Sequence, residues 1–288
     1  MAPYMKKVLF VLAATAAGLL ASGRPAQAQI SLEGEWNGRY LEDQMDRVPG
    51  GDLGDYTGLP INEAAKFYAD SWDISRSSVP EHQCQVYNIG HIFRGPVQFR
   101  VWNERDPDSQ ELLAIKMYLG TYEQWRTIWM DGRPHPPEYA MHTAMGFSTG
   151  KWDGDNLVVT TTHLKEGWTR RNGLTRSDSA TVTEHFIRHG DTMTLVISVV
   201  DPKYYTEPVV RSRDYEYEVN GDIGPYPCEP VEEILRPKGA IPHHLPGANL
   251  FLSEYAKAHG IPAEAARGGA ETMYPEYRKK LREMMGIK

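Results

Sequence analysis

The chain has 288 residues, a formal net charge of −7 at neutral pH and only two cysteines. Its acidic balance argues against a surface that binds nucleic acid or anionic lipid. The length is enough to bury a full core, and it favours one large domain over two equal ones.

The segment 1–28 has the features of a cleavable signal peptide. Two lysines precede an apolar run at 8–21, and the small residues of Ala26-Gln27-Ala28 provide a cleavage site. The run is too short for a membrane span, which needs ~20 predominantly apolar residues. We expect cleavage after Ala28, no membrane span, and a location in the periplasm or outside the cell.

Alternating hydrophobic and polar residues predict about nine strands in the mature chain. The first lies at 32–40, and Asn62 then introduces a helical pattern that ends at Trp72. Further strands are expected at 97–103, 111–118, 125–130, 146–152, 157–164, 180–188, 192–200 and 209–219. Asp153-Gly154 predicts a tight hairpin turn, because this pair tolerates positive φ angles.

Strands in sequential antiparallel order predict an up-and-down β-barrel whose interior can hold one small ligand. Gly34-Glu35-Trp36 resembles the opening strand of lipocalin-like barrels. After Cys228, helical patterns at 249–259 and 274–285 predict a tail packed on the barrel. We therefore predict a mainly β fold with a signal peptide at 1–28, a lipocalin-like barrel domain at 29–228 with a helical insertion near 61–72, and a C-terminal helical extension at 229–288.

The two cysteines, Cys84 and Cys228, both lie in the mature chain. In an oxidising compartment an even pair is most simply explained by one disulfide, and two buried thiols are the alternative. A Cys–Cys metal site fits less well, because neither cysteine has a second one nearby. We predict a Cys84–Cys228 disulfide.

The stretch 128–168 carries D-G-R-x-H-P followed by G-x-S-x-G-x-W-x-G-D-x-L-V-V. It resembles a group of secreted bacterial proteins of sphingomonad and acidobacterial type, and blocks at 55–60, 80–84, 201–208 and 267–277 extend the resemblance over nearly the whole mature chain. That group has no established activity, so the resemblance implies no reaction. Its commonest form often has Asp at position 160 and Gly-Phe at 163–164, where this chain has Thr160 and His163-Leu164. Any role of His163 would therefore belong to a subgroup.

The motif Gly146-Phe147-Ser148-Thr149-Gly150 matches the nucleophile elbow of serine hydrolases. An elbow requires a strand that turns sharply into a helix. The residues that follow continue a strand into a hairpin, so we expect these glycines to permit strand curvature or the close approach of a ligand.

A candidate acid–base unit combines His163 with Glu184. Burial beside a carboxylate can bring the pKa of an imidazole near neutrality, and Arg170 or Arg171 would then stabilise developing negative charge. Adjacent strand residues point to opposite faces, so only one of Glu184 and His185 can line the cavity. The alternative is an ordinary structural hydrogen bond.

Aromatic and basic side chains also make a candidate ligand site. Trp168 beside two arginines would hold a carboxylate, sulfate or phenolate, and a solvated loop is the alternative. The candidate ligand-binding residues are Trp129, His142, Trp168, His185 and Arg126. No metal-binding spacing, phosphate loop or dinucleotide fingerprint is present, so we expect no metal and no cofactor, although histidines from different strands and a noncovalent haem stay open.

These observations predict a periplasmic or secreted barrel that binds one small amphipathic or aromatic molecule in its cavity. The first alternative is a cofactor-independent lyase, isomerase or hydrolase that uses His163 and Glu184. The second is a structural envelope protein with a filled barrel. No nucleic-acid partner is expected, and the oligomeric state is left open.

Overall fold

A computed structural model describes residues 30–39, 51–79, 82–94, 97–170, 172–230 and 235–287. The chain divides into two compact units, Met1–Ser31 and Leu32–Lys288. The predicted signal peptide at 1–28 lies outside the described residues. The architecture below is that of the second unit.

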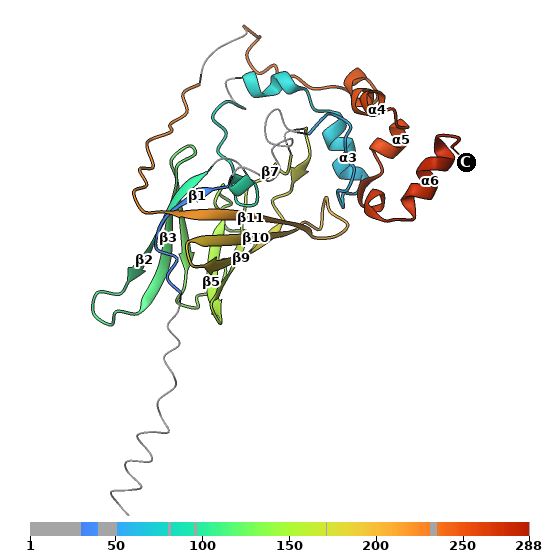
Figure 1. The fold of residues 1–288 in the computed structure, drawn as a ribbon. Helices are drawn as coiled ribbons and strands as arrows, with labels where there is room; N and C mark the ends of the chain where they lie inside the picture. Colours follow the sequence, from blue (N-terminus) through green and yellow to red (C-terminus); the bar gives the residue numbers. More distant parts are fainter. Residues whose placement is uncertain are drawn as a thin grey trace, which may run out of the picture. The chain divides into compact units, whose positions relative to one another are not determined.

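Nine strands close into a β-barrel (Figure 1). They are β1 (Gly34–Gly38), β2 (Gln98–Arg105), β3 (Leu112–Leu119), β4 (Gln124–Trp129), β5 (Phe147–Asp153), β6 (Asn156–Thr162), β9 (Thr181–His189), β10 (Thr192–Val200) and β11 (Val209–Glu218). Around the barrel their order is β1-β11-β10-β9-β6-β5-β4-β3-β2, and β2 pairs with β1 to complete the ring. The prediction of a mainly β, lipocalin-like barrel of nine strands is confirmed.

One neighbouring pair is parallel. β4 and β5 run in the same direction, with Ile128 beside Ser148 and Trp129 beside Thr149. Parallel neighbours need a long connection, and the segment 130–146 supplies it by returning the chain to the end of the barrel where β4 began. The expectation of antiparallel order throughout is therefore wrong at this one step. The predicted tight turn is confirmed, since Asp153 pairs with Asn156 across a turn in which Gly154 has a φ of +59°.

Aromatic side chains fill the centre of the barrel. The short helix η3 (Ile92–Arg94) is buried, and the ring of Phe93 lies 5.6 Å from that of Phe99, 6.3 Å from Phe186 and 6.4 Å from Tyr215. These three rings belong to β2, β9 and β11. The Tyr215 hydroxyl donates a hydrogen bond to the Phe93 carbonyl at 2.9 Å, which holds η3 in place. Phe93 and these rings therefore occupy part of the barrel interior in which a central ligand was predicted.

A helical insertion lies between β1 and β2. Helix α3 (Glu63–Asp70) starts where Asn62 Oδ1 accepts a hydrogen bond from Ala65 N at 3.0 Å, a typical N-cap. The helix was predicted from this pattern, and η1 (Ile74–Ser78) follows it. A second sheet of two short strands, β7 (Gly167–Trp168) and β8 (Thr175–Arg176), was not predicted.

The described part of the C-terminal tail contains five short helices gathered near α3 (Figure 1). They are η4 (Leu250–Ser253), α4 (Glu254–His259), α5 (Ala263–Ala266), η5 (Gly269–Met273) and α6 (Tyr277–Met284). Arg267 donates two hydrogen bonds to the Asp70 carboxylate, at 2.6 and 2.7 Å, and Tyr56 Oη donates a third at 2.6 Å. The backbone N–H of Tyr56 also donates to Ala266 O at 2.9 Å. These bonds attach the tail to the insertion.

The disulfide between Cys84 and Cys228 is present, with a Cα–Cα distance of 5.4 Å. It joins the loop before η3 to the segment that follows β11, as predicted. In the described parts of the chain, no helix combines the length and the apolar character that crossing a membrane requires.

Candidate functional site

Arg126 and Glu184 form an ion pair inside the barrel. Arg126 Nη1 donates to Glu184 Oε1 at 3.0 Å, and Nη2 donates to Oε2. The two side chains are 1% and 0% exposed. A bidentate pair satisfies both charged groups away from water. Glu184 thus faces inward, whereas His185 faces outward and its Nδ1 bonds to Asn156 Nδ2 at 3.0 Å.

Ser148 is hydrogen-bonded to the Arg126 side chain of this buried pair and is not placed as a nucleophile. Its hydroxyl oxygen accepts hydrogen bonds from Arg126 Nε at 3.3 Å and Nη2 at 3.2 Å, and lies 2.8 Å from Thr161 Oγ1. Ser148 sits within β5 and is buried, so the exposed turn of a nucleophile elbow is missing. A Cβ atom on Gly150 would lie 2.6 Å from Met130 Sδ. This glycine therefore makes room for the side chains of Met130 and Ile128, and the close approach of a ligand at this position stays a prediction.

His163 and Glu184 do not form the predicted acid–base unit. β6 ends at Thr162, and His163 has a φ of +56°, which turns its side chain out of the strand alternation. His163 Nε2 lies 3.0 Å from Pro137 O, while Glu184 is held by Arg126. The register also separates the two residues, because Glu184 on β9 lies opposite Val159, four residues before His163.

A chain of hydrogen bonds instead links His163 to His135. His163 Nδ1 and His135 Nδ1 each lie 2.7 Å from Thr162 Oγ1, and His135 Nε2 lies 2.9 Å from Thr149 Oγ1. The Pro137 carbonyl can only accept, so neutral His163 carries its proton on Nε2 and accepts from Thr162 through Nδ1. Thr162 then accepts from His135. Thr149 and Thr162 point away from the barrel interior, since their neighbours Ser148 and Thr161 point inward.

This outer histidine cluster also includes His142. Its Nδ1 lies 3.0 Å from Leu164 O, and its ring centroid lies 5.2 Å from that of His163. The cluster anchors the crossing segment 130–146 to β5 and β6. Its geometry is that of a structural hydrogen-bond network, which was the alternative considered for these histidines.

The crossing segment is expected to lose stability at acidic pH. Burial, with a smaller effect from His163, lowers the pKa of His135. In the unfolded chain a histidine has a pKa near 6.5, so the unfolded state binds more protons below that value. Stability is therefore fully present above about pH 6.5 and is lost as the pH falls toward the lower folded pKa.

Urea unfolding of the wild type and of His135→Gln at neutral and acidic pH tests this expectation. The acid-induced loss should be smaller in the variant. NMR titration should place the midpoint of the His135 ring below 6.5, and a midpoint above that value would contradict the argument.

The other predicted residues lie apart from one another. Trp129 faces outward beneath the guanidinium of Arg133, whose Cζ is 3.5 Å from the ring centroid. Arg170 pairs with Asp55 at 3.4 Å, and Arg171 lies outside the described residues. Of the predicted ligand-binding residues, only Trp168 lines one of the two cavities described below.

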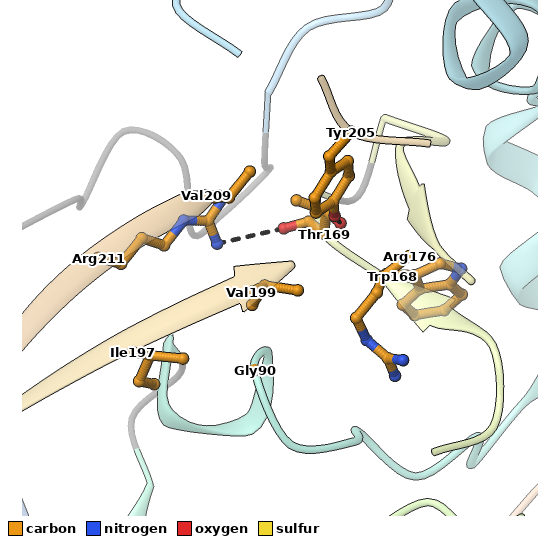
Figure 2. A pocket seen from close by; sticks show the side chains of 9 residues that line it. All are labelled: Gly90, Trp168, Thr169, Arg176, Ile197, Val199, Tyr205, Val209 and Arg211. Carbon is orange, nitrogen blue, oxygen red and sulfur yellow. Dashed lines mark hydrogen bonds between the residues drawn. The ribbon is translucent and has the colours of Figure 1, made fainter. Parts of the chain in front are cut away.

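A small cavity lies at one end of the barrel (Figure 2). It is lined by Gly90, Trp168, Thr169, Arg176, Ile197, Val199, Tyr205, Val209 and Arg211. Its volume is about 10 Å³, and a space of this size holds about one water molecule. Figure 2 shows Arg211 reaching toward Thr169, whose carbonyl accepts a hydrogen bond from Arg211 Nη1 at 3.4 Å.

The polar groups around this end cavity bond to the chain. Arg176 donates to Ser177 O at 2.7 Å and Lys165 O at 2.9 Å, and the Tyr205 hydroxyl is hydrogen-bonded to Thr169 Oγ1. Burial raises the pKa of Tyr205 to about 12 and lowers that of Arg176. The cavity is too small for an organic ligand, so it is not the binding site that its aromatic and basic residues suggest.

A much larger pocket lies between the insertion and the tail, and we call it the side pocket. Its volume is about 480 Å³, within the range of about 300–1,000 Å³ found for small-molecule sites. It is lined by Gly51, Asp52, Leu53, Trp72, Asp73, Ile74, Asn172, His244, Phe251, Glu254, Tyr255 and Ala258. On size alone, the side pocket is the better candidate.

Two polar atoms on residues of the side pocket are buried without a hydrogen-bond partner: Trp72 Nε1 and Asn172 Oδ1. The two residues are 5% and 1% exposed. An unpaired buried group of this kind costs roughly 1–3 kcal/mol. No described group offsets this cost at either atom.

Several contacts hold these two residues in position. Trp72 follows α3, and its carbonyl accepts a hydrogen bond at 3.3 Å from Asn249, which begins the helical part of the tail. Asn172 Nδ2 donates to Asp52 O at 3.1 Å. Gly173, with a φ of +91°, lets the loop approach closely, because a Cβ there would lie 2.5 Å from Trp72 Cβ. The predicted ligand site at Trp168 and the arginines that follow it lies in the same loop as Asn172, but no pattern in the sequence indicates that Trp72 and the tail meet there.

Within the described residues, no group of three or more histidine, cysteine, aspartate or glutamate side chains is arranged to hold a metal ion.

No family model and no curated protein matches this chain. Among solved structures, a secretary abundant heat soluble (SAHS) protein from Ramazzottius varieornatus is 13% identical, with 67% of this chain and 98% of that chain covered and a TM-score of 0.30. A variant of the fluorescent protein UnaG is 11% identical, with 66% and 97% covered and a TM-score of 0.28. Scores this low carry no argument, so the class, a lipocalin-like β-barrel, rests on the strand pairing of the chain itself.

Proposed function

We propose that this protein is a β-barrel protein that binds one small amphipathic or aromatic molecule, and that the ligand lies in the side pocket. The observation that carries the proposal is a pocket of about 480 Å³ with a buried donor, Trp72 Nε1, and a buried acceptor, Asn172 Oδ1, both without partners. Phe93 and its neighbours occupy part of the barrel interior, and of the two described cavities only the side pocket is large enough for such a ligand.

The walls of the side pocket suit a ligand with a flat apolar part. Leu53, Trp72, Ile74, Phe251 and Tyr255 supply aliphatic and aromatic surface. Ligand sites are typically lined in this way, with a few polar groups that orient the molecule. The barrel then acts as a rigid scaffold that holds the insertion and the loop of Asn172.

Binding of the neutral aromatic dye N-phenylnaphthylamine tests the proposal. Trp72→Phe keeps an aromatic ring but removes the Nε1 donor. Ligands that are extracted from the native host and accept a hydrogen bond from this donor should bind the variant about three- to tenfold more weakly. This is the loss expected for a hydrogen bond worth about 0.5–1.5 kcal/mol. Phe251→Ser changes an exposed wall residue and should weaken binding of the dye itself. Trp129→Phe, on the outer barrel face, is the matched control.

Circular dichroism and urea unfolding would show that each variant is folded. The proposal fails if the folded wild type binds neither dye nor extracted ligand, or if Phe251→Ser and Trp129→Phe have the same effect.

We also propose that the protein works in the periplasm or outside the cell, as a member of the secreted bacterial group that its motifs resemble. The Cys84–Cys228 disulfide supports an oxidising compartment, because such bonds are rare in the cytosol. Mass spectrometry of exported protein purified for the binding assay should give a chain that starts at Gln29. Protein that keeps residues 1–28 would contradict this location.

A further inference from the structure

The ionisable residues of the side pocket are mainly acidic. Asp52, Asp73 and Glu254 line it, and His244 is the one basic side chain in the lining. His244 Nε2 lies 3.5 Å from Asp73 Oδ2, so Asp73 has a nearby counterpart. Asp52 and Glu254 form no ion pair with any described residue. Among the residues that line the pocket, three carboxylates therefore accompany one histidine.

Asp73 keeps its charge in spite of partial burial. Burial alone would raise its pKa, but the hydrogen bonds that its Oδ1 accepts from Ser75 N at 2.9 Å and Ser75 Oγ at 2.7 Å outweigh burial, and the pKa lies below its ordinary value. Arg236 contributes in the same direction. Two further arginines are near without lining the pocket: Arg76, stacked over the Trp72 ring at 5.7 Å, and Arg170, paired with Asp55.

Aromatic rings accompany these carboxylates. Phe251 on η4 and Tyr255 on α4 line the pocket together with Trp72. The negative face of an aromatic ring attracts an ammonium group, and quaternary and primary ammonium ligands are commonly held in this way. Asn172 Oδ1 adds a buried acceptor that still lacks a donor. Carboxylates, rings and an open acceptor are the groups that recognise a cation.

Resting on the proposed function, we infer that the side pocket selects a positively charged ligand: an amphipathic or aromatic ammonium compound. An oxygen atom on the same molecule would accept the hydrogen bond that Trp72 Nε1 offers. The ligand's charge is thus positive, whereas the arginines near Trp168 in the sequence suggest a negatively charged ligand. Arg170 is engaged by Asp55, and it does not line the pocket.

Three probes that share one ring system separate charge from shape. They are naphthylmethylamine, naphthalenemethanol and naphthoate, each measured by displacement of N-phenylnaphthylamine at neutral pH. We expect the amine to bind about tenfold more tightly than the alcohol and the naphthoate to bind most weakly. High salt should reduce the preference for the amine, because exposed charges are screened.

The double variant Asp52→Asn with Glu254→Gln tests which charges are responsible. The amine-to-alcohol affinity ratio should fall from about tenfold to about threefold or less. Glu138→Gln, an exposed residue on the crossing segment, is the matched control and should leave the ratio unchanged. The amine-to-alcohol affinity ratio is measured within each variant. A general loss of affinity would weaken both probes equally and would leave this ratio unchanged.

The outcomes also distinguish this inference from the proposed function. If the alcohol binds as tightly as the amine, or if the double variant keeps the full ratio, the preference for a cation is refuted while binding in the pocket stands. If neither the dye nor any probe binds the folded protein, the proposed function fails and this inference fails with it.

Discussion

Glu184→Gln is expected to lower the free energy of unfolding by about 3–5 kcal/mol, because it leaves the guanidinium of Arg126 in the barrel interior without a counter-charge. Glutamine has nearly the same size as glutamate, so the loss reports charge rather than a cavity. Urea unfolding followed by tryptophan fluorescence measures it. A change below about 1 kcal/mol would show that water or another group compensates Arg126.

Two further variants identify the cause of that loss. Arg126→Met combined with Glu184→Leu removes both charges, and such paired replacements are often neutral or stabilising. Ser148 and Thr161 can still bond to each other at 2.8 Å. The double variant should therefore be more stable than Glu184→Gln alone. Glu216→Gln, which breaks the exposed pair of Arg39 and Glu216, is the control and should cost less than about 1 kcal/mol.

Replacing both cysteines by serine is expected to lower the free energy of unfolding by about 4–5 kcal/mol. Cys84 and Cys228 are 144 residues apart, and the chain-entropy model gives about 4.7 kcal/mol for a closed loop of 100 residues. The midpoint of urea unfolding should fall in the double variant, and a reducing agent should lower the stability of the wild type toward the same value.

The same reducing agent should leave the Cys84→Ser, Cys228→Ser variant unaffected, which controls for other effects of the reagent. Two alkylatable thiols in unreduced wild type, or a double variant as stable as the wild type, would contradict the prediction.

The strands were predictable because alternation is a local property of the sequence. Each strand carries its own pattern, and Asn62 marks the start of α3 because its side chain accepts a hydrogen bond from a residue only three positions later. The direction of β5 was not predictable, since it depends on the path of the segment 130–146. Alternation places Arg126 and Glu184 among inward-facing candidates, but their pairing across 58 residues depends on strand order and register.

The candidate site was harder to predict than the fold. His163 and Glu184 do not meet, because the register places Glu184 opposite Val159 and because His163 has a positive φ. The side pocket brings together segments around Leu53, Trp72, Asn172 and Phe251, which meet because the tail is attached at Asp70. No spacing within the sequence encodes that attachment. Local patterns predicted a ligand site only in the loop 168–173, which contains one lining residue of the side pocket, Asn172.

The side chain of Phe93 lies inside the barrel, where a ligand lies in barrels with an empty interior. A barrel with an empty interior gains stability from its ligand by mass action, so its melting temperature rises with ligand concentration. In this protein the central occupant is covalently part of the chain and is always present. The folding equilibrium therefore does not depend on a ligand at the position of Phe93, whereas a ligand in the side pocket would still raise the melting temperature by mass action.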